Sequence, residues 1–139
     1  MAARQTNTPS VVFTLGPLWQ ESLISAIKDT PMVVKKIDEF RRYKEQNPLA
    51  PFGSSDKAFN NAGIYSKYLP KARKAHLTPD ISIVYELRGR NPTDILLYGV
   101  FTHADLGTGQ PANKNVQKNM AKRLALEQIE NFLIKLIGS

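Results

Sequence analysis

The stretch "ISIVYELRGRNPTDILLYGVFTH", residues 81–103, decides the fold. In its first seven residues, apolar side chains recur at every second position, which is the period of a β-strand. These are Ile81, Ile83, Tyr85 and Leu87. "RGRNPTD" predicts a turn, and "ILLYGVFTH" is almost continuously apolar, as expected of a central strand covered on both faces. With an extended segment over about Leu69–Leu77 before them, these strands predict an antiparallel meander.

The flanking segments predict helices around this sheet. "SVVFTL" alternates like a first strand, and two helices follow it, one from Pro17 and one opened by Thr30 as N-cap and Pro31. A last helix is predicted over residues 114–137. It carries an apolar stripe that should dock on its own chain, comprising Ile129, Phe132, Leu133, Leu136 and Ile137. We therefore expect a flexible tail over residues 1–9. A single α+β domain over residues 10–139 should follow, with the order β-α-α-β-β-β, helices against one face of an antiparallel sheet, and an added C-terminal helix.

The composition narrows the functional classes. The 139 residues include no cysteine, which excludes disulfides and thiolate chemistry and favours a reducing cytoplasm. The N-terminus lacks the apolar core of a signal peptide, and the longest apolar run is too short to span a bilayer, so no membrane role is expected. The net charge of +7 is typical of a protein that binds nucleic acid or another polyanion. A surface charge that only aids solubility is the competing interpretation.

Both histidines of the chain are placed at predicted strand ends. His76 ends the second strand and His103 ends the fourth, so antiparallel pairing brings both beside the start of the third strand, about 10 Å apart. Asp80, in the turn before the third strand, falls between them. Ordinary polar residues at strand ends explain this pattern equally well. A metal site that also uses Asp105 is a further alternative, although no i, i+4 ligand spacing supports it.

The cluster suits cleavage of RNA by its own 2′-hydroxyl. That reaction needs a base for the hydroxyl proton, an acid for the leaving 5′-oxygen, and positive charge on the phosphate, and histidine can carry either proton near neutral pH. No metal or other cofactor is required. The substrate-binding candidates are the cations on the approach to His76, namely Lys71, Arg73 and Lys74.

Two quoted stretches, "HLTPDISIVYEL" (residues 76–87) and "VFTHADLGTG" (residues 100–109), resemble the YafQ branch of the RelE/ParE-like toxins of bacterial toxin–antitoxin systems. The matching positions are His76, Pro79, Asp80, Val84, Tyr85, Thr102, His103, Asp105 and Leu106. The resemblance implies a RelE-like fold and an endoribonuclease (mRNA interferase) that cuts mRNA, usually on the ribosome, and is neutralised by an antitoxin protein. It also implies acid–base roles for His76, Asp80 and His103.

The sequence departs from this pattern at several positions. Gly99 stands where the family usually has an arginine, Gly107 replaces an aromatic residue, Ile81 replaces a frequent tryptophan, and there is no third histidine. We expect Lys74, which should share a strand face with His76, to supply the missing charge. The departures leave open a catalytically impaired binding protein that holds RNA, the ribosome or a protein partner. The histidines argue against a third class, the gyrase poisons of the ParE side.

Overall fold

The structure is a computed structural model that describes residues 11–59, 63–89 and 92–138, with the backbone alone from residue 127 onward. The predicted tail over residues 1–9 lies outside the described residues. The elements along the chain are β1 (Val11–Leu15), α1 (Trp19–Asp29), α2 (Val33–Gln46), β2 (Lys57–Ala58), α3 (Ile64–Tyr68), β3 (Ala72–His76), β4 (Ile81–Arg88), β5 (Thr93–Thr102), α4 (His103–Leu106) and α5 (Lys114–Gly138).

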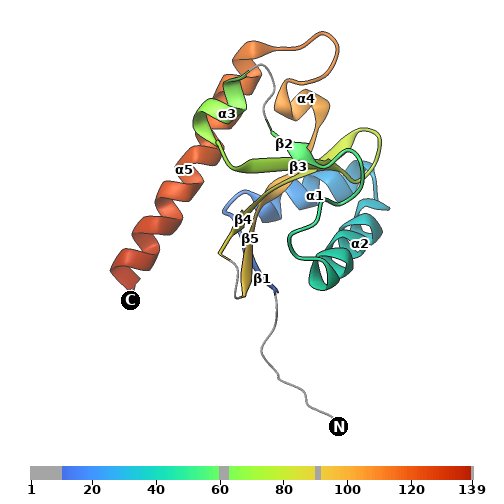
Figure 1. Cartoon of the computed structure of the whole chain (residues 1–139). Coiled ribbons are helices and arrows are strands. Elements are labelled where there is room, and N and C mark those ends of the chain that lie inside the picture. The colour runs from blue at the N-terminus through green and yellow to red at the C-terminus, as the bar shows by residue number, and fades with distance from the viewer. Residues whose placement is uncertain (1–10, 60–62, 90–91, 139) are drawn as a thin grey trace.

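The strands form one five-stranded sheet in the order β1-β5-β4-β3-β2 (Figure 1). The predicted meander is present: β3 pairs antiparallel with β4, and β4 pairs antiparallel with β5. The apolar β5 is central, as predicted, because β1 and β4 flank it. The sheet is mixed rather than wholly antiparallel, since β1 lies parallel to β5. The two helices after β1 carry the chain away from the sheet and back, so β1 can pair parallel with a strand far along the chain.

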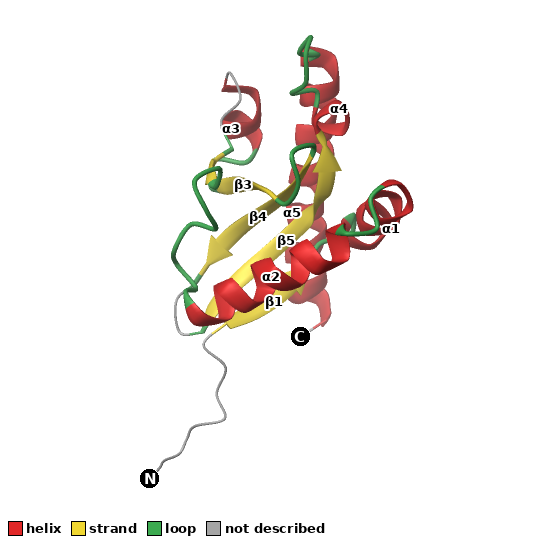
Figure 2. Ribbon diagram, turned by 90° about the vertical axis from the view of Figure 1, so that its right-hand side faces the viewer, coloured by secondary structure: helices red, strands yellow, loops and turns green. Residues whose placement is uncertain are grey.

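Helices cover both faces of the sheet, which corrects the expectation of one covered face. On one face, α1 and α2 pack on a cluster that includes Ile83, Tyr85 and Ile95. On the other face, α3 and α5 pack on a cluster that includes Leu96 and Tyr98. Figure 2 shows α2 in front of the sheet and α5 behind it. A continuously apolar β5 requires this arrangement, because side chains on both faces of the strand must be removed from water.

The first half of α5 docks on its own chain. Ala121 and Leu124 are fully buried and belong to the same apolar cluster as Leu96 and Tyr98. Arg123 also lies 3.4 Å from the Glu21 carboxylate of α1. The apolar stripe that motivated the prediction lies outside the residues whose side chains are described.

The boundaries of some helices and strands differ from those predicted from local sequence patterns. The second helix begins at Val33, because the Thr30 carbonyl accepts from the Val33 N–H (3.0 Å) within a turn, and the Thr30 side chain does not act as N-cap. The short α3 occupies part of the loop before the second predicted strand, and that strand begins at Ala72 instead of near Leu69. An element of five residues is too short to show helical periodicity.

Candidate functional site

The two histidines come together at one end of the sheet. His76 is the last residue of β3 and pairs with Ser82, and Thr102, directly before His103, pairs with Ile81. The imidazole centroids are 5.5 Å apart and the rings meet edge to face at 67°. This is closer than the predicted 10 Å, which counted only the spacing of the strands; the side chains themselves reduce the gap.

Asp80 completes the cluster from the turn between β3 and β4. Its Oδ1 lies 3.5 Å from His103 Nδ1, a contact that becomes an ion pair when the imidazole is protonated. The turn is closed by Thr78, whose Oγ1 accepts hydrogen bonds from the N–H groups of Ile81 (3.0 Å) and Asp80 (3.3 Å). The structure thus unites the three residues that the sequence placed in one region.

His103 is held by the short helix that it begins. Thr102 is the N-cap of α4: its Oγ1 accepts from the Asp105 N–H, and Asp105 Oδ2 accepts from the Thr102 N–H, both at 3.1 Å. This reciprocal capping box fixes the chain on both sides of His103. Asp105 therefore has a structural role here. Gly107 ends the helix at φ +71°, and a Cβ there would lie 2.5 Å from the Asn113 carbonyl oxygen, so this glycine serves the turn.

The surroundings of His76 favour its neutral form. Partial burial lowers the pKa of His76 below its usual value, and the positive charges of Lys74 and His103 lower it further. The imidazole is therefore unprotonated near neutral pH, which is the state that a general base needs.

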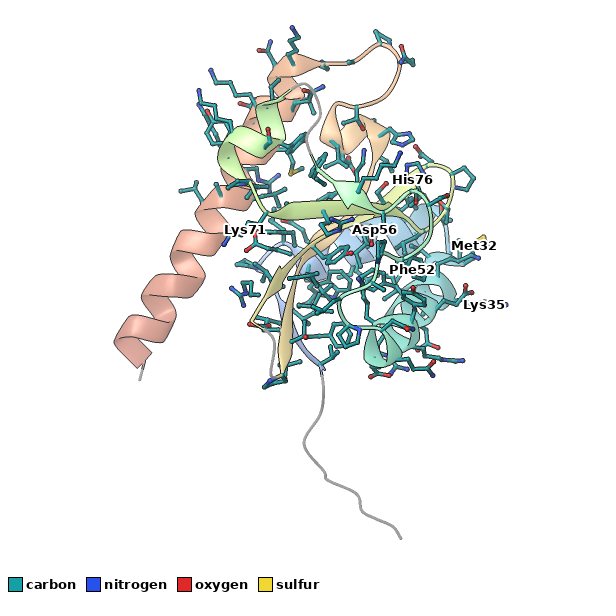
Figure 3. All side chains as sticks on the ribbon, in the orientation of Figure 1. Met32, Lys35, Phe52, Asp56, Lys71 and His76 are labelled. Carbon is teal, nitrogen blue, oxygen red and sulfur yellow. The ribbon has the colours of Figure 1, made fainter. Side chains whose placement is uncertain are left out.

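The three candidate cations have different environments. Lys71 is exposed, directly before β3 (Figure 3). Arg73 forms an ion pair with Asp56, Nε to Oδ1 at 2.8 Å. Lys74 is half-buried, its Nζ lies 5.2 Å from the Phe59 ring centroid, and burial lowers its pKa. Of the three, Lys74 is the one whose charge acts on His76.

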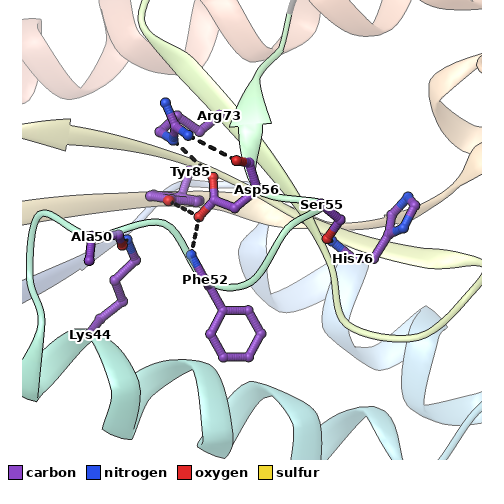
Figure 4. A network of polar contacts seen from close by, with 8 residues as sticks. All are labelled: Lys44, Ala50, Phe52, Ser55, Asp56, Arg73, His76 and Tyr85. Carbon is purple, nitrogen blue, oxygen red and sulfur yellow. Dashed lines mark hydrogen bonds and ion pairs between the residues drawn. The ribbon is translucent and has the colours of Figure 1, made fainter.

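A buried polar network behind the histidines was not predicted (Figure 4). The Asp56 carboxylate accepts from Arg73, from the Phe52 N–H (2.7 Å) and from the Tyr85 hydroxyl. Burial, and then Asp56, raise the pKa of Tyr85, so its hydroxyl stays protonated and donates. Lys44 lies beside this network, donating to the Ala50 carbonyl.

This network leads to the candidate site. Ser55, next to Asp56, accepts a hydrogen bond from the His76 N–H at 3.0 Å. Asp56 therefore anchors the segment that holds the end of β3. Its two side-chain partners on the sheet are 17 and 29 residues away along the chain, so no local sequence pattern identifies them.

Gly99 has no room for the arginine usual in the resembling family. A Cβ at this position would lie 2.6 Å from Phe101 Cζ and 2.8 Å from Ser22 Oγ. Ser22 is itself fixed, because its hydroxyl accepts from the Val100 N–H and donates to the Trp19 carbonyl. The packing between α1 and β5 has closed the position from which that arginine would extend.

A cavity of about 390 Å³ borders the cluster on the side of α1 and α5. Asp80, Ile81 and Thr102 contribute to its wall. Four carboxylates and one arginine line it, namely Glu21, Asp29, Asp80, Asp105 and Arg123. This side of the site is therefore acidic, in contrast to the basic approach along β3.

The described residues contain neither a metal-binding cluster nor a membrane-spanning helix. No three histidine, aspartate or glutamate side chains there lie together in a way that fits a metal ion. None of the described helices combines the length and apolar character needed to cross a membrane.

Comparison with known proteins places the fold. No protein-family model and no curated protein matches the chain in sequence. Among solved structures, the E. coli DinJ–YafQ toxin–antitoxin complex is similar, with 18% identity over 70% of this chain and 97% of that chain and a TM-score of 0.54. A second structure of that complex gives 18% identity, 68% and 96% coverage and a TM-score of 0.53. A YoeB/ParE toxin from Agrobacterium tumefaciens is also similar, with 13% identity over 66% of this chain and 97% of that chain and a TM-score of 0.51.

These similarities define the fold class: the chain adopts the RelE/ParE-like toxin fold. Two of the similar structures are DinJ–YafQ complexes. This agrees with the resemblance to the YafQ branch seen in the sequence.

Proposed function

We propose that the protein is a toxin-like endoribonuclease that cleaves mRNA without a metal ion. The observation that carries the proposal is the imidazole pair, 5.5 Å apart, with Asp80 beside His103 at the end of the sheet. Two groups able to exchange protons, held this close together, match the needs of phosphodiester cleavage by the 2′-hydroxyl.

In the proposed reaction His76 is the general base. Its lowered pKa leaves the ring free to take the proton of the 2′-hydroxyl. The 2′-oxygen then attacks phosphorus and the bond to the 5′-oxygen breaks, while His103, oriented by Asp80, gives its proton to that oxygen. The products are a 2′,3′-cyclic phosphate and a 5′-hydroxyl end. Lys74 stabilises the charge that builds on the phosphate.

The partners follow from the same likeness. The similar E. coli structures are toxin–antitoxin complexes. We therefore expect a small antitoxin protein that neutralises this chain. The substrate is expected to be mRNA on the ribosome, in the cytoplasm.

The test compares wild type with His103→Ala in a purified translation system, with the 5′ ends of the message mapped. General acid–base catalysis contributes ~10²–10⁴-fold, so cleavage by the variant should fall by about that factor. New 5′-hydroxyl ends should form with wild type only. Equal cleavage by the two proteins contradicts the role of His103. If neither protein cleaves the message, the proposed ribonuclease activity is contradicted.

One observation favours a second candidate, a binding protein of the same fold without catalysis. The position usual for the family arginine is closed at Gly99, and Lys74, whose charge acts on His76, is half-buried. Such a protein would hold RNA or the ribosome and slow translation with no new RNA ends, so end mapping separates the two candidates.

A further inference from the structure

A second cavity, of about 400 Å³, lies between α3 and the first turns of α5, apart from the histidine cluster. Its walls are formed by Gly63, Ile64, Lys67, Tyr68, Lys114, Asn115 and Lys118. Three of these seven residues are lysines and none is acidic. We call it the lysine groove.

The groove is a fixed feature of the fold. Tyr65 of α3 is fully buried, and its hydroxyl donates to the Leu106 carbonyl at 2.7 Å. The side chains that join α3 to α5 belong to one apolar cluster, which includes Tyr65, Ala121 and Leu124. The lysines therefore project from two helices that pack on the core of the fold.

The charge of the groove is not neutralised within the described residues. Lys67, Lys114 and Lys118 are exposed, and among the ion pairs of the described chain none involves them. Three of the five cations of α2 differ: Lys36 pairs with Glu39, and the two arginines pair with Asp38 and Glu45 on the same helix. Within the described part of the chain, positive charge without an ion-pair partner, which contributes to the net charge of +7, is thus more concentrated at α3 and α5 than on α2.

The groove is connected to the candidate site by the chain itself. Lys67 is in α3, Lys71 follows it, and β3 then carries Lys74 and ends at His76. At about 3.3 Å per residue, β3 spans roughly 13 Å. A basic path therefore leads from the lysine groove to the histidines, whereas the cavity on the other side of the site is lined by four carboxylates.

We infer that the lysine groove binds the backbone of single-stranded RNA and holds the part of the substrate that flanks the cleavage point. Lysines track phosphates without reading sequence, and the groove wall includes the half-buried ring of Tyr68, whose centroid lies 5.9 Å from Lys67 Nζ. In the inferred complex Lys67 turns to a phosphate and a base stacks on this ring. An acidic protein segment would use the lysines but would gain nothing from stacking. The inference relies on the proposed function only in naming RNA as the ligand.

The test measures binding of an unstructured 12-nucleotide RNA by fluorescence anisotropy at several salt concentrations, with His103→Ala as the parent to prevent cleavage. The groove variant adds Lys114→Ala and Lys118→Ala. The matched control adds Lys28→Ala and Lys35→Ala, which remove the same charge from α1 and α2. Losing two phosphate contacts should reduce the slope of log K against log salt by about 1.4, at ~0.7 per contact. The control should keep the slope of the parent.

Adding Tyr68→Leu to the same parent separates RNA from other polyanions. Loss of one stacked base should weaken RNA binding about fivefold or more, and binding of a polyglutamate peptide should not change. Equal slopes for the groove and control variants overturn the inference, as does a parent that binds no RNA. If the slope falls as expected but wild type produces no RNA ends, the groove stands and the proposed ribonuclease fails.

Discussion

Removing the buried carboxylate of Asp56 should be among the most damaging single changes in this fold. The carboxylate has no exposed surface. It accepts from Arg73 (2.8 Å), from the Phe52 N–H (2.7 Å) and from the buried hydroxyl of Tyr85. In Asp56→Ala, Tyr85 loses the carboxylate that accepts from its hydroxyl, and Arg73 loses the negative charge opposite its guanidinium and keeps only its hydrogen bond to the backbone carbonyl of residue 56 (3.0 Å).

Breaking a buried ion pair from one side costs about 3–5 kcal/mol, because the remaining charge is left unpaired. For a chain of this size each kcal/mol moves the melting temperature by roughly 3–5 °C. Thermal unfolding followed by circular dichroism should therefore show Asp56→Ala melting about 10–20 °C below wild type. Asp38→Ala is the matched control, since Asp38 pairs with Arg41 and Arg42 on an open helix face. Surface pairs contribute about 0–1 kcal/mol each, so this variant should melt within a few degrees of wild type.

A double-mutant cycle tests the physical reason. Arg73→Met leaves the carboxylate buried without its cation, and Asp56→Ala with Arg73→Met removes both charges. The double variant should therefore be less destabilised than the sum of the two single variants. Strict additivity, or an Asp56→Ala melting point within 3 °C of wild type, would refute this account of the network. Because Ser55 holds the His76 N–H, Asp56→Asn at permissive temperature should also slow cleavage.

Three further changes test other parts of the structure. Lys74→Met should raise the pKa of His76, because Lys74 lowers it; an NMR titration of the imidazole measures this, and Lys71→Met should have less effect. Gly99→Ala should destabilise the fold by about 1–3 kcal/mol in urea unfolding, because its Cβ meets fixed neighbours at 2.6 and 2.8 Å; unchanged stability would mean that this packing is loose. Burial lowers the pKa of Lys44 from 10.5 to about 8, so between these values the unfolded chain binds more protons and the stability from this residue rises with pH. Relative to Lys44→Met, wild type should gain up to about 3 kcal/mol between pH 7 and 10.5, and a difference that does not vary with pH would contradict the assignment.

The sequence was most informative where local pattern and burial agree. The alternation in β4 and the apolar run in β5 predicted the meander, and the meander placed His76, Asp80 and His103 together. It was uninformative about pairing between distant segments. Nothing in "SVVFTL" distinguishes parallel from antiparallel pairing, and the partner of β1 is about 80 residues away.

The unpredicted parts of the candidate site arise in the same way. Asp56 is an isolated carboxylate in a loop until folding places it against β3 and β4. The lysine groove exists only because α3, a five-residue helix, packs on α5. Contacts of this kind depend on the assembled core, and no periodicity in the chain encodes them.

The closed position at Gly99 and the half-buried Lys74 together limit how this site can handle a phosphate. In the resembling family an arginine on the last strand carries that charge, and here a side chain at position 99 would collide with Phe101 and Ser22. Among the described residues, Lys74 of β3 is the lysine whose positive charge already lowers the pKa of His76. The same lysine would stabilise the phosphate and keep the proposed base unprotonated. Its replacement should therefore change the pH dependence of cleavage as well as the rate, whereas a lysine that only binds RNA would change affinity alone.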